Sequence, residues 1–566
     1  MTELTINNKK AVLPSDLQFQ LIFDNPYFTK SSTHTLEVEL PMPSNIHIFG
    51  MLHRVDVTKQ KITFPAVLTA DGYQLLNGKA LILGTDERTV KVQLMSGNAE
   101  FNFLNRDDLY INEVNWEAED VFTVENGYYN SYVRTGDVLS GPAYLIDGDW
   151  TIHPDRSVIS PEPVPFLYKL ARVIIEHFGF RIGDSVLENS WLKHIICIGG
   201  SELTRNSAWA YKNKIKVWGL MPHWTVKEFF TYLEEFAGIV TYIDDKTRSA
   251  MMIDINDFFL QQSVSIVDTL DEYESDVSSE DEADANVTVG NTGYDLPSST
   301  DDGYNRLDNK IIITAETKTA DDYDTLYKKW SSDSEGVKLK TLYTANGRSY
   351  ITKDGAFTEV DLYGNLLRNK DDKEVDNSLH FAPCVIKQEV VGLYKFNDRN
   401  LVKVADYTIN VPVSYYNSAP IKNYILNIQE VIEGKTELQD KSDKDIMEVA
   451  LCPGAKPFNI DSYKINLLSP YIDYTQKSPN QAEDNDIYSL SLHEVCEKSM
   501  GTRHRSLNQV KSEVTYKINF LLHEIPDIRK TFIIHSQKYF AKSIKVNITA
   551  KGFDKVMEGE FYKIEV

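Results

Sequence analysis

The chain has 566 residues, which corresponds to about four domains at roughly 150 residues each. Hydrophobic residues make up 42% and charged residues 25%, a balance typical of folded globular proteins that excludes a wholly disordered chain. Acids outnumber bases by 83 to 59, so the formal net charge is −24, which argues against the clustered basic surface that specific nucleic-acid binding needs.

The N-terminus and the cysteines carry no targeting or redox signal. Residues 1–10 are polar and lack the apolar run of a secretory signal, and no run of 18 apolar residues could span a membrane. We therefore expect synthesis in the cytoplasm. The cysteines have no CxxC spacing, which favours buried thiols over a disulfide framework or a zinc site: Cys197, Cys384, Cys452 and Cys496.

The N-terminal quarter alternates apolar and polar residues, which is the periodicity of half-buried β-strands. The first predicted strand carries its apolar residues on one face: Leu36, Val38 and Leu40. A meander is predicted next, over 62–69, 73–76, 79–83 and 89–94, and its last strand has Val90, Val92 and Leu94 on one face. Its tight turns are predicted at two dipeptides that tolerate positive φ, Asp71-Gly72 and Asn77-Gly78.

Two helices are predicted further along the chain. Four prolines interrupt regular structure between His153 and Pro165, and Pro165 is expected as the first residue of a helix that Gly179 ends. The second helix begins at a capping box of Thr225 and Glu228 and ends at Gly238. Both have apolar stripes at helical spacing: Phe166, Leu167, Leu170, Val173, Ile174 and Phe178 in the first, and Val226, Phe229, Phe230, Leu233 and Phe236 in the second.

A hairpin is predicted directly after the second helix. Its strands cover 239–243 and 250–255, and Asp244-Asp245-Lys246 forms the turn, so the helix and hairpin make one α+β unit. Beyond it we predict a strand over 310–314, a polar helix over 319–330 and a loop-rich region over 331–376. The remainder returns to β character, with strands predicted over 514–520, 544–548 and 560–566.

An acidic stretch separates the two halves of the chain. No Lys or Arg occurs between Ser249 and Asn305, and acids are densest from Asp271 to Asp284. A block of like charge predicts a solvated, self-repelling loop. The alternative is an electrostatic surface that repels polyanions or docks a basic partner, and composition alone leaves both open.

The chain lacks the motifs of common catalytic sites. It has no GxxxxGK[ST] phosphate loop, no GxGxxG turn and no GxSxG nucleophile elbow. The run His493-Glu494-Val495-Cys496-Glu497 has Glu where a zinc helix has its second His, so no metal site is assigned. His53, His177 and His223 are expected to be structural. We predict no catalytic, cofactor-binding or metal-binding residue, and a structural or binding protein rather than an enzyme.

Three segments together resemble the tail hub proteins of phages and prophages, which are related to the baseplate hubs and tail-associated proteins. They are "IFGMLHRVDVTKQKITFPAVLTADGYQLLNGKALILG" with "VKVQLMSGN", then "MPHWTVKEFFTYLEEFAGIVTYIDDKTRSAMMIDINDFF", and finally "YFAKSIKVNITAKGFDKVMEGEFYKIEV". The middle segment is the most telling, because its helix-plus-hairpin order matches the module of those hubs. The resemblance covers about half the chain and brings no active-site residue with it.

The resemblance implies a fold and a role. The fold expected is α+β and mainly β, with tube-like β-barrel domains and a helix-plus-hairpin module. The predicted parts are an N-terminal β domain over 1–152, an α+β domain over 153–262, an acidic and loop-rich middle region over 263–400 and a mainly β C-terminal domain over 401–566. The hub would be a homotrimeric ring at the virion tail tip.

That ring would join the tail tube or distal tail protein to a spike or fibre, and its channel would pass DNA and a tape-measure protein. Three copies would carry 3 × (−24) = −72 formal charges, and an acidic lumen would repel DNA phosphates. Two alternatives stay open: a carbohydrate-binding adhesin, which would need an exposed aromatic platform, and a cell-wall-degrading enzyme of the tail tip.

Overall fold

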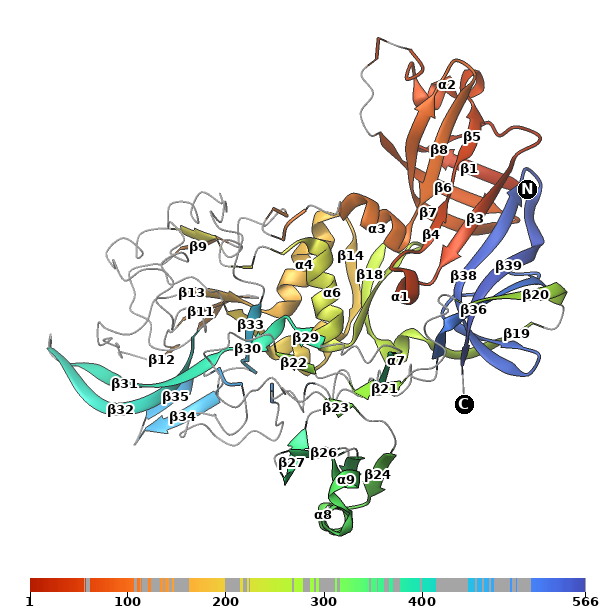
Figure 1. Cartoon of the computed structure of the whole chain (residues 1–566). Helices are drawn as coiled ribbons and strands as arrows, with labels where there is room; N and C mark the ends of the chain where they lie inside the picture. The colour runs from red at the N-terminus through yellow and green to blue at the C-terminus, as the bar shows by residue number, and fades with distance from the viewer. Residues whose placement is uncertain are drawn as a thin grey trace.

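Strands dominate the chain, as the sequence predicts, and the longest helices pack beside them (Figure 1). The computed structural model describes residues 1–54, 56–57, 62–105, 109–111, 113–114, 121–123, 133–135, 138–141, 145–146, 162–198, 214–216, 221–222, 224–266, 269–277, 286–289, 292–294, 311–312, 316–339, 341–345, 348–353, 355–360, 366–369, 377–397, 400–413, 446–453, 456–460, 463–467, 470–472, 489–490, 495 and 510–564.

The largest sheet has 14 strands among the residues that the structure describes. They are β1 (Thr2–Ile6), β2 (Lys9–Lys10), β3 (Gln18–Asp24), β4 (Thr33–Thr35), β5 (Val38–Pro41), β6 (Thr63–Ala70), β7 (Tyr73–Thr85), β8 (Thr89–Met95), β19 (Leu260–Ile266), β20 (Thr269–Val277), β36 (Val510–Leu521), β37 (Lys530–Ile534), β38 (Gln537–Thr549) and β39 (Gly552–Ile564). The order along its main path is β2-β1-β6-β7-β8-β4-β3-β38-β39-β36-β20, with β5 on β8 and with β37 joining β19 to β38.

The two ends of the chain meet in this sheet (Figure 1). Strand β3 pairs antiparallel with β38 over its whole length, from Gln18 opposite Thr549 to Asp24 opposite Ser543. A carboxylate oxygen of Asp71 accepts a hydrogen bond from the Phe553 backbone N–H at 3.2 Å, which ties the β6–β7 turn to the start of β39. The N-terminal and C-terminal strands therefore bury one common core.

The C-terminal part of the sheet has six strands in the order β19-β37-β38-β39-β36-β20. Its first and last members, β19 and β20, are consecutive in the chain but do not pair with each other. The described strands thus form a large, almost entirely antiparallel sheet, and they close no barrel. The mainly β class with helices is confirmed, and the closed tube-like barrels expected from the family resemblance are not present in the described residues.

The N-terminal meander differs from the prediction at one turn. Asp71-Gly72 is a tight turn with both φ angles positive, as predicted. Asn77-Gly78 is not a turn, because β7 runs through it without a break. Gly78 lies where a Cβ atom would overlap the Met95 carbonyl oxygen of β8. Glycine is required at this position because the two strands approach each other closely. In the sequence, such a glycine looks the same as a glycine in a turn.

The first predicted strand also differs from the structure. Val38 and Leu40 are buried in β5 as predicted, but Leu36 lies between β4 and β5 and is 64% exposed. Thr35 takes the buried position, where its hydroxyl accepts a hydrogen bond from the Leu94 N–H at 2.9 Å. The alternation of buried and exposed residues is interrupted at this point because β4 pairs with both β3 and β8.

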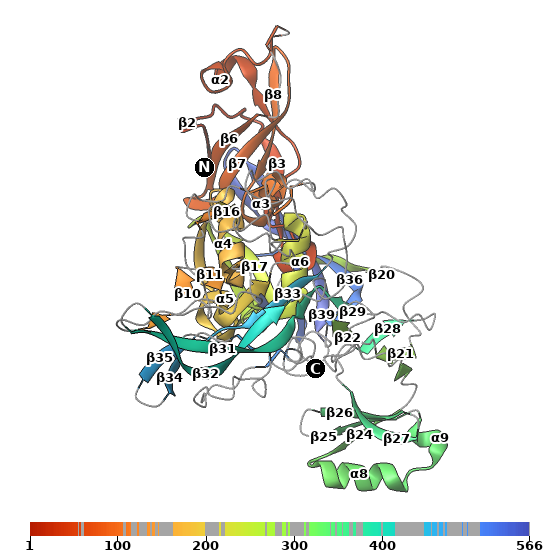
Figure 2. The ribbon, with the colours of Figure 1, turned by 90° about the vertical axis from the view of Figure 1, so that its left-hand side faces the viewer.

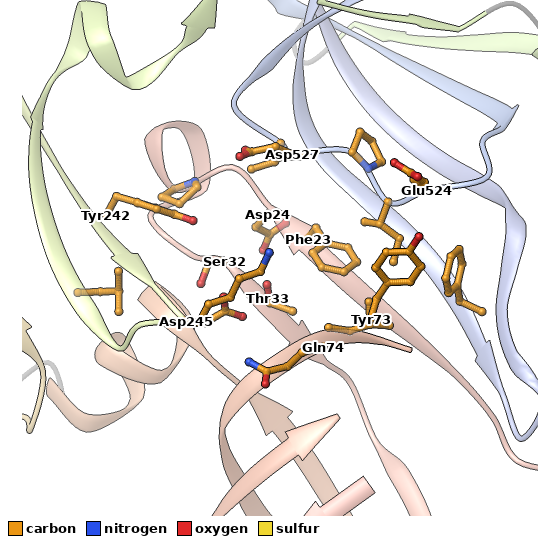
Figure 3. A pocket seen from close by; sticks show the side chains of 18 residues that line it. Phe23, Asp24, Ser32, Thr33, Tyr73, Gln74, Tyr242, Asp245, Glu524 and Asp527 are labelled. Carbon is orange, nitrogen blue, oxygen red and sulfur yellow. The ribbon is translucent and has the colours of Figure 1, made fainter. Parts of the chain in front are cut away.

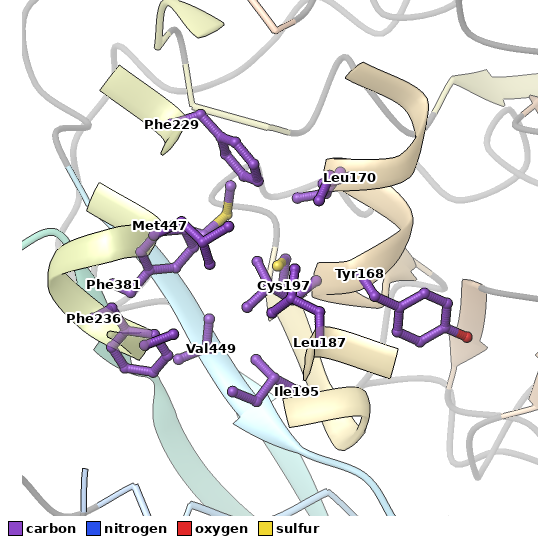
Figure 4. Packing of buried hydrophobic residues seen from close by; sticks show 14 of the residues in the cluster. Tyr168, Leu170, Leu187, Ile195, Cys197, Phe229, Phe236, Phe381, Met447 and Val449 are labelled. Carbon is purple, nitrogen blue, oxygen red and sulfur yellow. The ribbon is translucent and has the colours of Figure 1, made fainter. Parts of the chain in front are cut away.

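The middle of the chain forms a helical module with a core of its own. Its elements are α4 (Leu167–His177), β14 (Arg181–Ser185), α5 (Val186–Asn189), a 3₁₀ turn (Trp191–His194), β15 (Ile195–Ile198), α6 (Val226–Ala237), β17 (Ile239–Asp244), β18 (Ser249–Asp254), α7 (Ile255–Phe258), β30 (Phe381–Pro383) and β33 (Met447–Leu451). Figure 4 shows Leu170 of α4 and Phe229 and Phe236 of α6 facing Cys197, Met447 and Val449. This core therefore joins the helices to strands contributed by the second half of the chain.

The helix predictions hold for this module, with one correction. The capping box of Thr225 and Glu228 is present at α6, and Gly238 ends the helix with φ +64°. The apolar stripe of α4 is buried as predicted. Pro165, however, is the last residue of β13 (Glu162–Pro165), where it lies opposite Val138. The helix therefore begins two residues later than predicted, after the N-cap Phe166.

The acidic stretch begins as a strand rather than the predicted loop. Residues Thr269–Val277 form β20, which pairs antiparallel with β36. In this backbone register Glu274 is paired with Lys517, so the acidic strand is placed beside a basic position from a distant segment. Residues 278–284 of the stretch lie outside the described residues.

The region expected to be a polar helix followed by loops is a compact α+β unit, and we call residues 316–360 the small unit. It contains β24 (Glu316–Ala320), α8 (Tyr323–Ser332), α9 (Glu335–Lys338), β25 (Thr341–Ala345), β26 (Arg348–Lys353) and β27 (Ala356–Val360), and the four strands form one sheet in that order. Helix α8 begins four residues later than predicted, after the N-cap Asp322. Figure 2 shows the small unit standing apart from the rest of the chain.

The other strands form short sheets and one long hairpin. The hairpin is β31 (Val385–Asn397) with β32 (Asn400–Val413). The short strands are β9 (Val121–Thr123), β10 (Val133–Thr135), β11 (Val138–Gly141), β12 (Leu145–Ile146), β16 (Lys214–Lys216), β21 (Asn286–Val289), β22 (Thr292–Tyr294), β23 (Ile311–Ile312), β28 (Leu366–Asn369), β29 (Asn377–Leu379), β34 (Lys456–Ile460) and β35 (Tyr463–Leu467). The helices not yet given are α1 (Pro26–Thr29), α2 (Met42–Phe49) and α3 (Gly97–Asn105). The four predicted domains and their boundaries stay predictions.

Candidate functional site

Helix α3 joins the large sheet to the helical module. It follows β8 directly, and Gly97 makes the turn with φ +58°. A Cβ atom on Gly97 would lie 2.5 Å from the Ser32 hydroxyl oxygen and 3.0 Å from the Ile243 carbonyl oxygen. Only glycine therefore lets the sheet and the β17–β18 hairpin approach this closely. We call this contact region the joint.

A buried ion pair lies at the centre of the joint. The Glu100 side chain on α3 is fully buried and accepts two hydrogen bonds from the Arg248 guanidinium, both at 2.9 Å. Donating these hydrogen bonds to Glu100 raises the pKa of Arg248. Lys79 of β7 brings a second positive charge to 3.8 Å from the carboxylate. A buried carboxylate with a bidentate arginine fixes both distance and orientation, so the pair sets how the hairpin meets the helix.

Neutral hydrogen bonds extend the joint along β17. The Asn98 side chain accepts a bond from the Ile243 N–H and donates one to the Thr241 carbonyl, both at 2.8 Å. One amide thereby takes the place of a neighbouring strand on this edge of β17. The Ser96 hydroxyl donates to the Asp245 carboxylate at 3.1 Å, at the turn of the same hairpin. The joint therefore holds the hairpin at both its edge and its turn.

A cleft of about 270 Å³ opens beside the joint (Figure 3). Three parts of the chain line it: the N-terminal strands at the end of β3 and the starts of β4 and β7, the β17–β18 hairpin, and the C-terminal part with the segment between β36 and β37 and the start of β39. Four carboxyl groups lie in its wall, those of Asp24, Asp245, Glu524 and Asp527, against the single ammonium group of Lys246. Aromatic side chains complete the wall: Phe23, Tyr73, Tyr242 and Phe553.

Burial changes the acidity of these carboxyl groups in different directions. Burial raises the pKa of Asp24, although His34, whose Nδ1 lies 3.5 Å from the carboxylate, opposes this rise. Burial also raises the pKa of Asp245, against the hydrogen bond from Ser96. For Asp527, burial is outweighed by the Arg529 side chain, whose hydrogen bonds at 2.9 and 3.1 Å lower its pKa.

The carboxyl groups and aromatic rings in the wall of the cleft suit a cationic group. Arg529 already shows this preference, since its guanidinium carbon lies 4.7 Å from the centre of the Tyr242 ring while the group binds Asp527. Burial raises the pKa of Tyr242, so its hydroxyl stays protonated at neutral pH. Within the described ranges, no group of three His, Cys, Asp or Glu side chains is arranged to hold a metal ion.

The residues singled out in the sequence do not converge on this site. His177 ends α4 and packs edge-on against Phe178 at 4.8 Å between ring centres, and burial lowers its pKa. His53 lies in the segment after α2, and its Nδ1 atom is buried. His223 lies outside the described residues, as does the run from His493 to Glu497 apart from the buried Val495.

The described cysteines lie in the core of the helical module. Cys197, Cys384 and Cys452 are all buried, as expected, and Cys496 lies outside the described residues. Cys197 faces Val449 in the β15–β33 register, and the Cys384 N–H donates to the Val449 carbonyl at 3.0 Å. These thiols belong to packing around β33 and are not part of the joint.

Sequence reasoning assigned no site residue and therefore missed the joint and the cleft. One signal was present, the Asp244-Asp245-Lys246 turn, which the sequence marks only as a hairpin corner. Glu100, Asn98 and Arg248 carry no motif, because their roles depend on a contact between segments about 150 residues apart. None of the described helices is long and apolar enough to cross a membrane.

No protein-family profile and no curated protein matches the chain. Two solved structures align with it at low similarity and over nearly the full length of both chains. The 43 kDa tail protein of prophage MuSo2 from Shewanella oneidensis aligns with a TM-score of 0.33 and 8% identity, over 100% of this chain and 98% of that one. The tail protein from Neisseria meningitidis MC58 aligns with a TM-score of 0.28 and 7% identity, over 100% and 96%. A TM-score below 0.5 does not establish a shared fold, so neither alignment carries an argument here.

Proposed function

We propose that this chain is a structural hub of a phage or phage-derived tail tip. Three copies would form a ring that joins the tail tube or distal tail protein to a spike or fibre. The observation that carries the proposal is the large sheet, in which both ends of the chain form one antiparallel wall with strands of up to 13 residues. A wall of this kind suits the side of a channel, since its backbone groups are satisfied within the sheet.

The joint supports the same proposal. A component between a tube and a spike has to keep a fixed angle between its ring-forming part and the part that holds its neighbours. The buried Glu100–Arg248 pair, together with the two hydrogen bonds of Asn98, fixes the helical module against the sheet without a flexible linker. The segments that resemble tail hubs in sequence include β7 and β39 of the large sheet, β17 and β18 at the joint, and α6, which packs in the core of the helical module.

Charge is the third support. A trimer would carry 3 × (−24) = −72 formal charges, and acidic positions on the channel side would keep DNA from binding to the wall during passage. We place the acidic strand β20 at or near that channel. A tail in which β20 lies on the outer surface would remove this part of the proposal and leave the ring itself untouched.

The mass of the purified chain in solution tests the ring. Light scattering is measured at low and high salt, and particles are imaged by electron microscopy. We expect a species of three times 64.6 kDa that appears as a ring, with more trimer at high salt because screening weakens the repulsion between copies. A monomer at both salt concentrations, up to the solubility limit, would overturn the homotrimer.

A further inference from the structure

The small unit, residues 316–360, has a hydrophobic core that shares no described residue with the core of the large sheet or with the joint. Its buried residues all come from α8 and the adjacent strands: Leu326, Trp330, Tyr343, Ala345 and Tyr350. The Asp333 carboxylate links two strands of the small unit, because it accepts hydrogen bonds from the Lys318 ammonium and the Tyr343 hydroxyl, both at 2.6 Å. Figures 1 and 2 both show the small unit projecting from the rest of the chain. The proposed ring does not explain why it is present.

Two tyrosines on α8 form an exposed aromatic surface. Tyr323 and Tyr327 lie one helical turn apart, and they are 47% and 44% exposed. Their ring centres are 6.1 Å apart and their planes differ by 25°. Two nearly parallel rings therefore face solvent side by side on one helix, where a soluble protein would ordinarily place polar residues. We call this pair the tyrosine platform.

The platform is held rigidly from behind. Tyr323 contacts Tyr350 and Phe357 at ring-centre distances of 5.4 and 6.0 Å, and Tyr327 contacts Phe357 at 5.7 Å. Phe357 in turn stacks on Tyr350 at 4.8 Å with an angle of 13°. Because the rings are already ordered by these contacts, a ligand that stacks on them loses little additional side-chain entropy.

The chemistry of the platform points to one class of ligand. Acids flank Tyr323 at Asp321, Asp322 and Asp324, and Lys328 and Lys329 follow Tyr327, so the charges around the platform are balanced and do not provide the positive groove that single-stranded nucleic acid needs. A neutral sugar ring has an apolar face of C–H groups that can stack on an aromatic ring, and a rim of hydroxyls that can donate to carboxylates. Tyrosine offers both an aromatic face and a polar hydroxyl.

We propose that the tyrosine platform binds a neutral glycan, with one pyranose ring stacked on Tyr323 or Tyr327 and sugar hydroxyls bonded to the neighbouring carboxylates. This inference does not depend on the hub proposal. A glycan site on a projecting unit would let a tail component hold a polysaccharide surface while the large sheet performs a separate task.

Saturation-transfer NMR on the full chain tests this site, with soluble neutral oligomers of N-acetylglucosamine and of glucose as probes. We expect transfer to the ring C–H protons of at least one oligomer, and at least tenfold weaker binding in Tyr323→Ala and in Tyr327→Ala. Tyr323→Phe should keep most of the binding, because it retains the stacking face. Leu339→Ala is the matched control, since it removes a 67% exposed apolar side chain from the same small unit without touching the platform.

Three results would overturn the proposal: no transfer to either oligomer, equal binding by the alanine variants and the unchanged chain, or preferential binding of single-stranded DNA. Amide exchange of β24 to β27 checks that each variant still folds. Light scattering on the same samples distinguishes a failure of the glycan site from a failure of the trimeric hub, because loss of the platform should leave the oligomeric state unchanged.

Discussion

The large sheet and the small unit differ in how far apart in the sequence their contacting residues lie. At the end of β3 in the large sheet, the Asn25 side chain donates a hydrogen bond to the Ala541 carbonyl at 3.0 Å, 516 residues further along the chain. In the small unit, the core residues that the structure describes all come from one short segment, residues 320–357. The large sheet therefore requires both chain ends to be in place before it gains its core, whereas the small unit can fold and unfold by itself.

The sharpest test of this contrast removes one buried side chain from each region. Phe561 in β39 is fully buried and contacts Phe520, Phe532 and Tyr539 at ring-centre distances of 5.9, 5.2 and 6.3 Å. Phe561→Ala should lower the free energy of unfolding of the sheet by about 4 kcal/mol, because it leaves a cavity in the core that both chain ends share. Hydrogen exchange should then show lost protection in β3 and β8 as well as in β39.

The matched change in the small unit is Leu326→Ala, at a position that is also fully buried. It should lower local stability by about 3 kcal/mol and raise exchange in α8 and in β24 to β27 only. If Leu326→Ala also loosened β3 and β38, the two regions would form one cooperative unit and the contrast would fail.

The same contrast explains which features the sequence predicts. The capping box of Thr225 and Glu228 and the stop at Gly238 depend on neighbouring residues, and the structure confirms them. The acidic stretch was expected to be a loop because its charges repel one another, but β20 pairs with β36, which comes from the far end of the chain. The Glu100–Arg248 pair is inaccessible to sequence reasoning for the same reason, since its partners are 148 residues apart.

Turn-forming residues in the sequence predict the wrong local structure in two places. Asn77-Gly78 has the composition of a turn, yet Gly78 serves a close approach between strands. The region expected to be rich in loops contains a hairpin, since Lys353 pairs with Ala356 and Gly355 has φ +80°. Composition alone does not separate these cases, because only the strand pairing shows whether the chain reverses.

Two glycines in β7 test how closely packed the large sheet is. Gly78→Ala should destabilise the chain by about 3 kcal/mol, because the new Cβ would overlap the Met95 carbonyl oxygen and force β7 and β8 apart. Gly84→Ala is the matched control in the same strand, where a Cβ would meet no atom within 4 Å, and it should change stability by less than about 1 kcal/mol. Urea unfolding measures both, and equal effects would contradict the close approach.

A third pair of variants tests the joint between the regions. Glu100→Gln leaves Arg248 without its carboxylate in a buried setting and should cost about 2 kcal/mol. Glu37→Gln breaks an exposed pair with Lys91 on the large sheet and should cost less than about 1 kcal/mol. Exchange should rise in the β17–β18 hairpin of Glu100→Gln while the small unit is unaffected. A cost no larger than that of Glu37→Gln would show that the joint does not depend on this pair.

The smallest expected effect is a pH dependence of opposite sign in the hairpin at the joint and in the small unit. Burial raises the folded-state pKa of Asp245, so folding of the β17–β18 hairpin favours the protonated acid, and the stability of the hairpin should rise as pH falls through this raised pKa toward the unfolded value of about 3.9. In the small unit, the hydrogen bond from Lys318 lowers the folded-state pKa of Asp333. That contribution is complete above the unfolded pKa of about 3.9 and is lost as pH falls further through the folded pKa.

Hydrogen exchange between pH 6 and pH 3 measures both regions in one sample, after correction for the intrinsic pH dependence of exchange. Protection of the β17–β18 hairpin should increase from pH 6 to pH 4 and then level off, while protection of β24 to β27 should stay level to about pH 4 and then decrease. Asp245→Asn should abolish the first change and Asp333→Asn the second. If both regions shifted in the same direction in every variant, the overall charge of −24 rather than these two carboxyl groups would control the pH response.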